Sequence, residues 1–136
     1  MSGGNTADQV DKVLDEMKSE HEQLFQTVDR IRDALSAEDM SVAKNQLIKL
    51  QIYQQSHFDH ETGLMEQYEY PHSNDHKQTH GNLIEALRSI IKLIYLENLQ
   101  RLNGELADYL DNSLKHVIEV DRPFQEFLSA SRGRDA

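Results

Sequence analysis

The sequence predicts an all-α fold, an antiparallel up-down-up-down four-helix bundle with a short C-terminal helix. Glycine and proline are scarce, with 6 and 2 residues among 136, so few positions favour turns over helix. Apolar residues recur at alternating steps of three and four, the spacing of one buried helix face. Four such segments are joined by short polar stretches, which favours antiparallel neighbours within a single domain over residues 1–136.

The first predicted helix follows a small, polar stretch, residues 1–7, which we expect to be disordered. Its buried face is expected to contain Val10, Leu14, Met17, His21, Leu24, Val28, Ile31 and Leu35. The pattern is interrupted over residues 36–39, and Asp39 or Ser41 can cap the next helix with a side-chain oxygen. His21 is therefore expected to face the core.

The second and third predicted helices each place two possible metal ligands on the buried face. The face of the second contains Leu47, Leu50, Gln54, His57, Glu61, Leu64 and Tyr68. This helix should end at Tyr70–Pro71, because the residue before proline avoids helical geometry. Ser73 is the expected N-cap of the third helix. The buried face of that helix contains His76, His80, Leu83, Leu87, Ile90 and Ile94.

The third connection is expected over residues 97–104, which are polar and contain Gly104. The buried face of the fourth helix is then Leu106, Tyr109 or Leu110, Ser113, His116 or Val117, and Val120. We expect this helix to break near Asp121–Pro123, with Pro123 in the first turn of a short closing helix. The apolar face of the closing helix is Phe124, Phe127 and Leu128.

Composition excludes several classes of function. A formal net charge of -10 would repel a nucleic-acid backbone and an anionic membrane surface. No apolar run approaches eighteen residues and no signal peptide is recognisable, so we expect a soluble, cytoplasmic protein without membrane contact. The absence of cysteine excludes disulfides, thiolate zinc sites and iron-sulfur clusters. Any metal must therefore be held by nitrogen and oxygen ligands.

Histidines are concentrated on the predicted buried faces. A single buried histidine is more often an ordinary core residue than a ligand. Here, however, His57 with Glu61 and His76 with His80 form i,i+4 pairs that lie on one helix face. Seven ligand-type residues from four helices fall in the same half of an antiparallel bundle, namely His21, His57, Glu61, His76, His80, His116 and Asp121. Burying them without partners would cost several kcal/mol each, which predicts a metal site of iron, zinc, copper or nickel.

These residues resemble the hemerythrin family, specifically the bacterial hemerythrins, over nearly the whole chain. The resemblance is carried by His21 with Leu24–Phe25, the run His57-Phe58-Asp59-His60-Glu61 with Met65, Tyr70–Pro71, His76, His80, His116 and Asp121. It implies two iron ions bridged by an oxo or hydroxo group. One iron would be bound by His76, His80 and His116, and the other by His21 and His57. Glu61 and Asp121 would bridge both.

The resemblance implies reversible O2 binding, with azide or a similar anion at the same position in the oxidised protein. Leu24, Phe58 and Val117 are expected to line the O2 pocket. His60 and His72 do not match ligand positions, and we expect them at the surface or beside a ligand. The chain also lacks tryptophan, and Ser113 stands where bacterial members often have an aromatic residue, so a wetter or more open pocket is expected.

Two other function classes compete with O2 binding. Ferritin-like di-iron enzymes use Glu-x-x-His motifs, which are missing from the buried faces here, and nitrogen-rich ligation favours reversible binding over catalysis. A bundle that acts only through protein interaction would contain no stoichiometric metal. Within the O2-binding class, storage, delivery and sensing stay open. The heptads before His21 could continue a coiled coil from a signalling module in the same polypeptide, such as a chemoreceptor, although we favour a simple start of the first helix.

Overall fold

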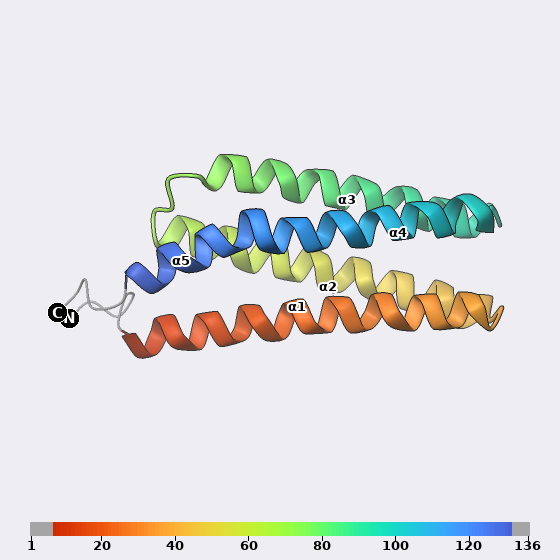
Figure 1. Ribbon diagram of the computed structural model, residues 1–136, viewed down its shortest axis with the longest axis horizontal. Coiled ribbons are helices and arrows are strands. Elements are labelled where there is room, and N and C mark those ends of the chain that lie inside the picture. The colour runs from red at the N-terminus through yellow and green to blue at the C-terminus, as the bar shows by residue number, and fades with distance from the viewer. Residues whose placement is uncertain (1–6, 132–136) are drawn as a thin grey trace.

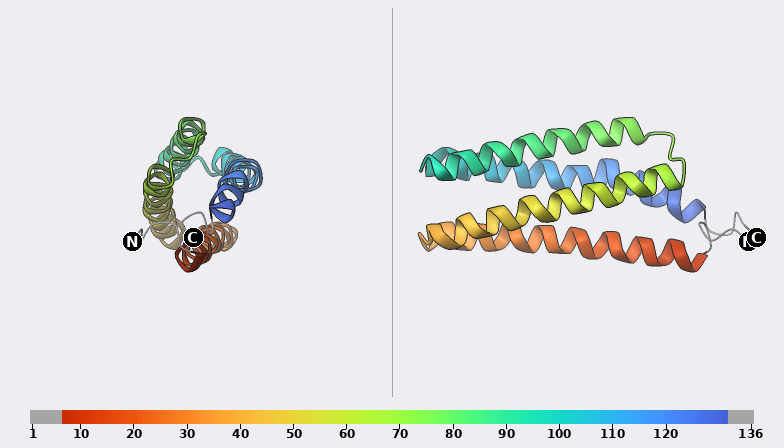
Figure 2. Two further views of the ribbon diagram at one scale, coloured as in Figure 1. Left: turned by 90° about the vertical axis from the view of Figure 1, so that its left-hand side faces the viewer. Right: turned by 180° about the vertical axis from the view of Figure 1, so that it is seen from behind.

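The computed structural model describes residues 7–131, which form an antiparallel up-down-up-down bundle, as the sequence predicts (Figure 1). Its segments are α1 (Ala7–Ser36), α2 (Met40–Gln67), α3 (Ser73–Tyr95), α4 (Leu99–His116), the π-helical segment η1 (Val117–Asp121) and α5 (Arg122–Ala130). Viewed from the end, the helices surround a common axis (Figure 2). The disorder expected for residues 1–7 falls outside the described residues, except at Ala7, which begins α1.

The three connections between helices begin with the same turn, although the one between α2 and α3 is longer than the other two. In the first, Asp39 N donates to Ala34 O at 2.8 Å and Glu38 N donates to Leu35 O at 3.1 Å, with Glu38 at a φ of 56°. This is the Schellman motif, which ends a helix with one left-handed residue and satisfies its last carbonyl groups. The same pattern surrounds Glu69 (φ 55°) and Glu97 (φ 56°). Such tight turns place consecutive helices side by side and antiparallel.

Several helix boundaries differ from the sequence-based expectation. Asp39 caps α2 as predicted, since its side chain accepts from Val42 N at 3.2 Å. The third connection is shorter than residues 97–104, because Asn98 accepts from Arg101 N at 3.3 Å and starts α4 at once, so Gly104 lies within the helix. Ser73 is not the N-cap of α3 but its first residue. The second helix ends at Gln67, ahead of the expected Tyr70–Pro71.

The expected break near Asp121–Pro123 is wrong. Helical structure continues from Leu99 to Ala130, so the last helix has 32 residues instead of ending before a short one. Pro123 follows η1, where the hydrogen-bond register changes and Arg122 N donates to Val117 O. A proline lacks the amide donor of a regular turn, and this change of register accommodates it without ending the helix. The α5 end of the helix turns toward α1 and packs against it (Figure 1).

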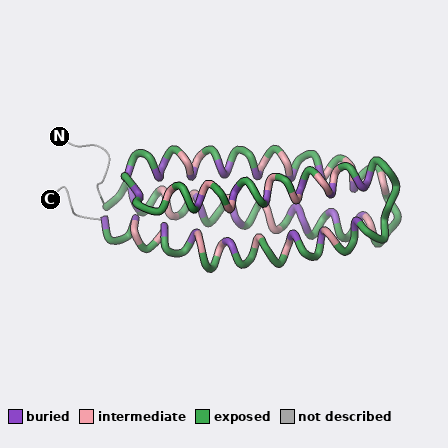
Figure 3. Tube along the Cα trace, turned by 90° about the horizontal axis from the view of Figure 1, so that it is seen from above, coloured by how far each residue is buried: buried purple, intermediate pink, exposed green. Residues whose placement is uncertain are grey.

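The apolar core consists of two clusters, and buried positions recur along every helix (Figure 3). The larger cluster extends toward the α1–α2 and α3–α4 connections and includes Leu47, Leu87 and Leu102. The smaller includes Val10, Met17, Met65, Phe124 and Leu128. Between them lie the buried histidines and carboxylates. Among the described helices, none is both long enough and apolar enough to cross a membrane.

Candidate metal centre

The structure brings together all seven predicted ligands in the interior of the bundle. They form two groups, in each of which one donor atom per residue lies within 4.8 Å of the others. The first group is Glu61, His76, His80, His116 and Asp121, and the second is His21, His57, Glu61 and Asp121. Glu61 and Asp121 belong to both. This geometric division matches the two-ion arrangement that the sequence resemblance implies.

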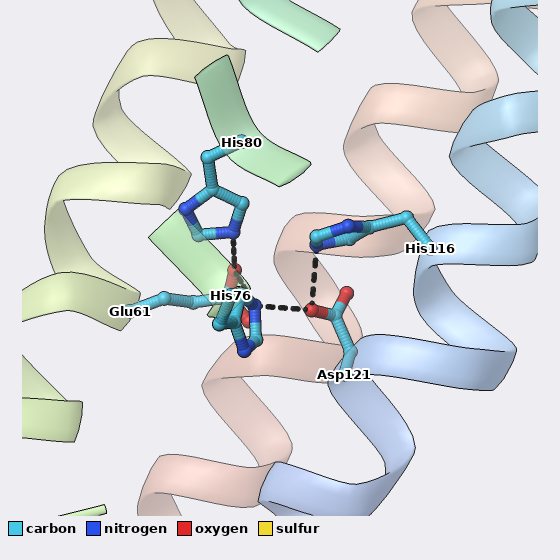
Figure 4. A group of neighbouring side chains, drawn as sticks. All are labelled: Glu61, His76, His80, His116 and Asp121. Atoms are coloured by element: carbon cyan, nitrogen blue, oxygen red, sulfur yellow. Dashed lines mark ion pairs between the residues drawn. The ribbon is translucent and has the colours of Figure 1, made fainter. Parts of the chain in front are cut away.

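The three-histidine group is drawn in Figure 4, where imidazoles from α3 and α4 surround the two carboxylates. His80 Nε2 lies 2.9 Å from Glu61 Oε1, and His116 Nε2 lies 2.9 Å from Asp121 Oδ1. On the other side, His21 Nε2 lies 3.0 Å from Asp121 Oδ2. Two ligands at right angles, each about 2.1 Å from one ion, are separated by about 3.0 Å, so these spacings suit ligands of a common cation.

The facing atoms do not satisfy one another as hydrogen bonds. The Nε2 atoms of all five histidines and all four carboxylate oxygens of Glu61 and Asp121 are buried without a hydrogen-bond partner. Unpartnered buried polar atoms are rare in folded proteins, because each costs roughly 1–3 kcal/mol. A cation that accepts lone pairs from all of these atoms removes this cost. The residues present therefore fit a bound metal.

The centre stabilises positive charge. Burial alone would raise the pKa of Asp121, but the imidazoles of His116 and His21 hold it well below its ordinary range. The pKa of Glu61 is also held well below its ordinary range, by His57, His76 and His80. Both carboxylates are therefore ionised in a buried position. Burial would lower the pKa of His57, but Glu20 and Glu61 raise it to about 10. Two buried negative charges suit a divalent cation, which would displace the proton that this raised pKa places on His57.

Hydrogen bonds on the outer side of two imidazoles orient their inner nitrogens. Glu20 Oε1 lies 2.6 Å from His57 Nδ1. Thr79 Oγ1 donates to His76 O at 2.8 Å and lies 3.1 Å from His116 Nδ1, so the imidazole N–H donates to the hydroxyl. In both rings the proton sits on Nδ1 and the Nε2 lone pair is free to bind a metal.

A small apolar cavity of about 30 Å³ adjoins the two-histidine side. Its lining includes Leu24, Phe58 and Val117, the three residues expected to line a ligand pocket, together with His21 and His57. Phe58 also stacks on His80, with ring centroids 3.8 Å apart.

Comparison with known proteins agrees with this geometry. The family model described as "Hemerythrin HHE cation binding domain" matches residues 12–122, a range that contains all seven ligand-type residues. The chain belongs to this hemerythrin family. No curated protein and no solved structure gives a significant match to it.

In this hemerythrin domain the sequence reasoning missed the residues that support the ligands. Glu20 and Thr79 lie beside ligands in the sequence, Glu20 next to His21 and Thr79 next to His80, but adjacency alone does not show which imidazole each one contacts. The cavity also carries a buried polar pair, since Tyr109 donates its hydroxyl hydrogen to Gln54 Oε1.

The remaining two histidines lie outside both donor groups of the described residues. His60 is partly buried and contacts Glu20, which in turn contacts His57, so it lies one residue further from the donor groups than the expected position beside a ligand. His72 is exposed at the start of α3, with its ring 5.7 Å from that of Tyr70.

Proposed function

We propose that this chain binds O2 reversibly at a non-haem di-iron centre, for storage, delivery or sensing of O2. The observation that carries the proposal is the position of the cavity, whose lining contains both histidines of the two-histidine position but only His116 of the other. If Glu61 and Asp121 bridge both ions, the ion beside His21 and His57 has one protein ligand fewer. A ligand from solution would bind there.

The size and lining of the cavity suit a diatomic molecule. A single water requires roughly 10–15 Å³ by this measure, so about 30 Å³ accommodates O2 or two waters. Leu24, Phe58 and Val117 present apolar surface to it, which limits access of bulk water and of protons. Two Fe(II) ions at the seven ligands would supply the electrons by which O2 is held.

The cavity is separated from a surface cleft between α1 and α5 by a few shared side chains. A surface cleft of about 750 Å³ in this region shares His21, Phe25 and Val117 with the lining of the cavity. These three side chains therefore separate solvent from the ligand position. His21 is only 8 % exposed, which shows that little of the centre is open to the cleft. A ligand from solution would therefore enter the cavity only when Phe25 or Val117 moves slightly.

The proposal is tested with the iron-loaded, reduced protein under anaerobic conditions. We expect elemental analysis to find two irons per chain, and addition of O2 to give visible absorption that disappears when O2 is removed. Azide should occupy the same position in the oxidised protein.

Two outcomes would contradict the proposal. A well-folded protein with one metal or none excludes a di-iron centre. A di-iron protein that consumes O2 without releasing it on evacuation is instead a di-iron enzyme of the oxidase or peroxidase type.

A further inference from the structure

We propose that Glu20, held in place by His60, is a positioning residue for His57 and strengthens cation binding at the two-histidine position. The inference rests on the metal centre proposed above and assigns roles to two side chains outside the donor groups. Both are only partly buried, each with 29 % of its side chain exposed, so they connect the centre to the surface between α1 and α2.

The contact between Glu20 and His57 is short and directional. Glu20 Oε1 lies 2.6 Å from His57 Nδ1, the ring nitrogen that faces away from the donor group. A carboxylate only accepts hydrogen bonds, so His57 donates from Nδ1 and keeps the Nε2 lone pair directed at Glu61 and the cation position. Without this acceptor, the ring could place its proton on Nε2 or rotate.

His60 holds Glu20 in the orientation that this contact needs. Its Nδ1 lies 2.9 Å from Glu20 Oε2 and 3.1 Å from Oε1, so Glu20 accepts from two imidazoles of the same α2 face.

The two cation positions are supported differently. On the three-histidine side, the outer nitrogen of His116 meets the neutral hydroxyl of Thr79. On the two-histidine side, the outer nitrogen of His57 meets a carboxylate. A ring whose N–H donates to a carboxylate binds a metal more strongly through its other nitrogen than a ring whose N–H donates to a neutral hydroxyl. The position with fewer protein ligands thus receives the more basic imidazole.

The test is titration of the full chain with Co(II) after removal of its native metal, following absorption and bound stoichiometry. The wild-type protein should bind two equivalents. In Glu20→Ala, we expect the affinity for one equivalent to fall about 10–100-fold while the other is unchanged. Glu20→Gln keeps the shape and an acceptor oxygen but not the charge, so it should fall between wild type and Glu20→Ala.

Matched controls separate positioning from general stability. Glu16→Gln removes the same charge from another α1 residue that contacts His60, at 3.6 Å, and should leave both equivalents unchanged. Thr79→Val should weaken binding of the equivalent at the three-histidine position, beside His116. The Co(II) absorption bands of the two positions distinguish which equivalent is lost. His60→Ala should weaken the Glu20-dependent equivalent, and His60→Asn, whose side-chain amide can replace Nδ1–H, should restore it.

Retention of both equivalents at wild-type affinity in Glu20→Ala would overturn the inference. Equal loss of both equivalents would also overturn it, since that result indicates a purely structural role. If Glu20→Ala does not fold, the same criteria are applied to Glu20→Gln and to the two variants His60→Ala and His60→Asn. A wild-type protein that binds fewer than two equivalents refutes the proposed di-metal centre instead.

Discussion

His116 and Asp121 lie five residues apart in one helix, and His116 Nε2 lies 2.9 Å from Asp121 Oδ1. In an α-helix of 3.6 residues per turn, side chains five residues apart point about 140° away from each other. The π-helical segment η1 begins directly after His116 and ends at Asp121, and its wider turns return the fifth residue to nearly the same face. The π segment therefore places a bridging carboxylate beside the imidazole.

Deletion of Ile118 should convert η1 to α-helix and leave Asp121 beside His116. The two residues then lie four positions apart, about 40° around an α-helix, so the later residues keep their orientation. Ile118 is 52 % exposed, so its own side chain contributes little to the core. We expect two metals per chain by elemental analysis, with helical circular dichroism retained, and the same result for Ile118→Ala, which keeps the π register. Fewer than two metals in the deletion variant alone would show that the centre needs the π geometry itself.

Replacement of His80 by Ala should lower metal content and thermal stability together. Metal that binds only the folded protein adds to its free energy of unfolding, by about 2.7 kcal/mol at a concentration one hundred times the Kd. The measurement is the melting temperature with and without a chelator. His72→Ala removes an exposed imidazole outside the centre and should respond to the chelator as the wild type does. Equal responses in all three proteins would contradict the metal assignment.

Enlarging Val117 to Ile or Leu should slow autoxidation of the O2-bound protein. Val117 lines both the cavity and the cleft that leads to it, so one added methylene narrows the path of water and anions. The decay of the visible absorption under O2 measures the rate. Val120→Ile adds the same group on the same helix but outside the cavity lining, and it should decay as the wild type does. An unchanged or faster decay in the Val117 variants would refute the steric explanation.

Removal of the Tyr109 hydroxyl should destabilise the protein through Gln54. Tyr109→Phe leaves the buried Gln54 Oε1 without its donor, at a cost of roughly 1–3 kcal/mol in the free energy of unfolding. Adding Gln54→Leu to this variant should recover part of the loss, because Gln54 Oε1 is then no longer present without a donor. Denaturant unfolding of the four proteins gives the coupling energy. Additive losses would mean that the contact contributes nothing.

Glycine at position 97 should stabilise the third connection. Glu97 adopts a φ of 56°, which costs a side-chain-bearing residue about 1–2 kcal/mol and glycine much less. Glycine also loses more chain entropy on folding, which offsets part of this difference. Glu97→Gly should therefore raise the free energy of unfolding, measured with denaturant, by about 0.5–1 kcal/mol. Glu97→Ala retains the Cβ atom and should gain nothing. A similar gain in both variants would point to the charge of Glu97 rather than to its backbone.

Much of the fold and the ligand set could be predicted from the sequence, because both depend on local spacing. Apolar residues at steps of three and four predict the helices, and i,i+4 pairs such as His57 with Glu61 predict which ligand-type side chains share a face. The four-helix order followed from the short connections. These patterns need no knowledge of which residue packs against which.

Other features depended on contacts between distant residues or on a change of backbone register. Glu20 and His57 come from different helices, and only the packing of α1 on α2 decides that this carboxylate meets that imidazole. Pro123 suggested a break, because a proline's missing donor normally ends a helix. The π segment before it moved the register and kept the helix continuous, so that Asp121 reached the centre. Local propensity describes one chain segment at a time, whereas these arrangements are selected by the free energy of packing several segments around buried polar atoms.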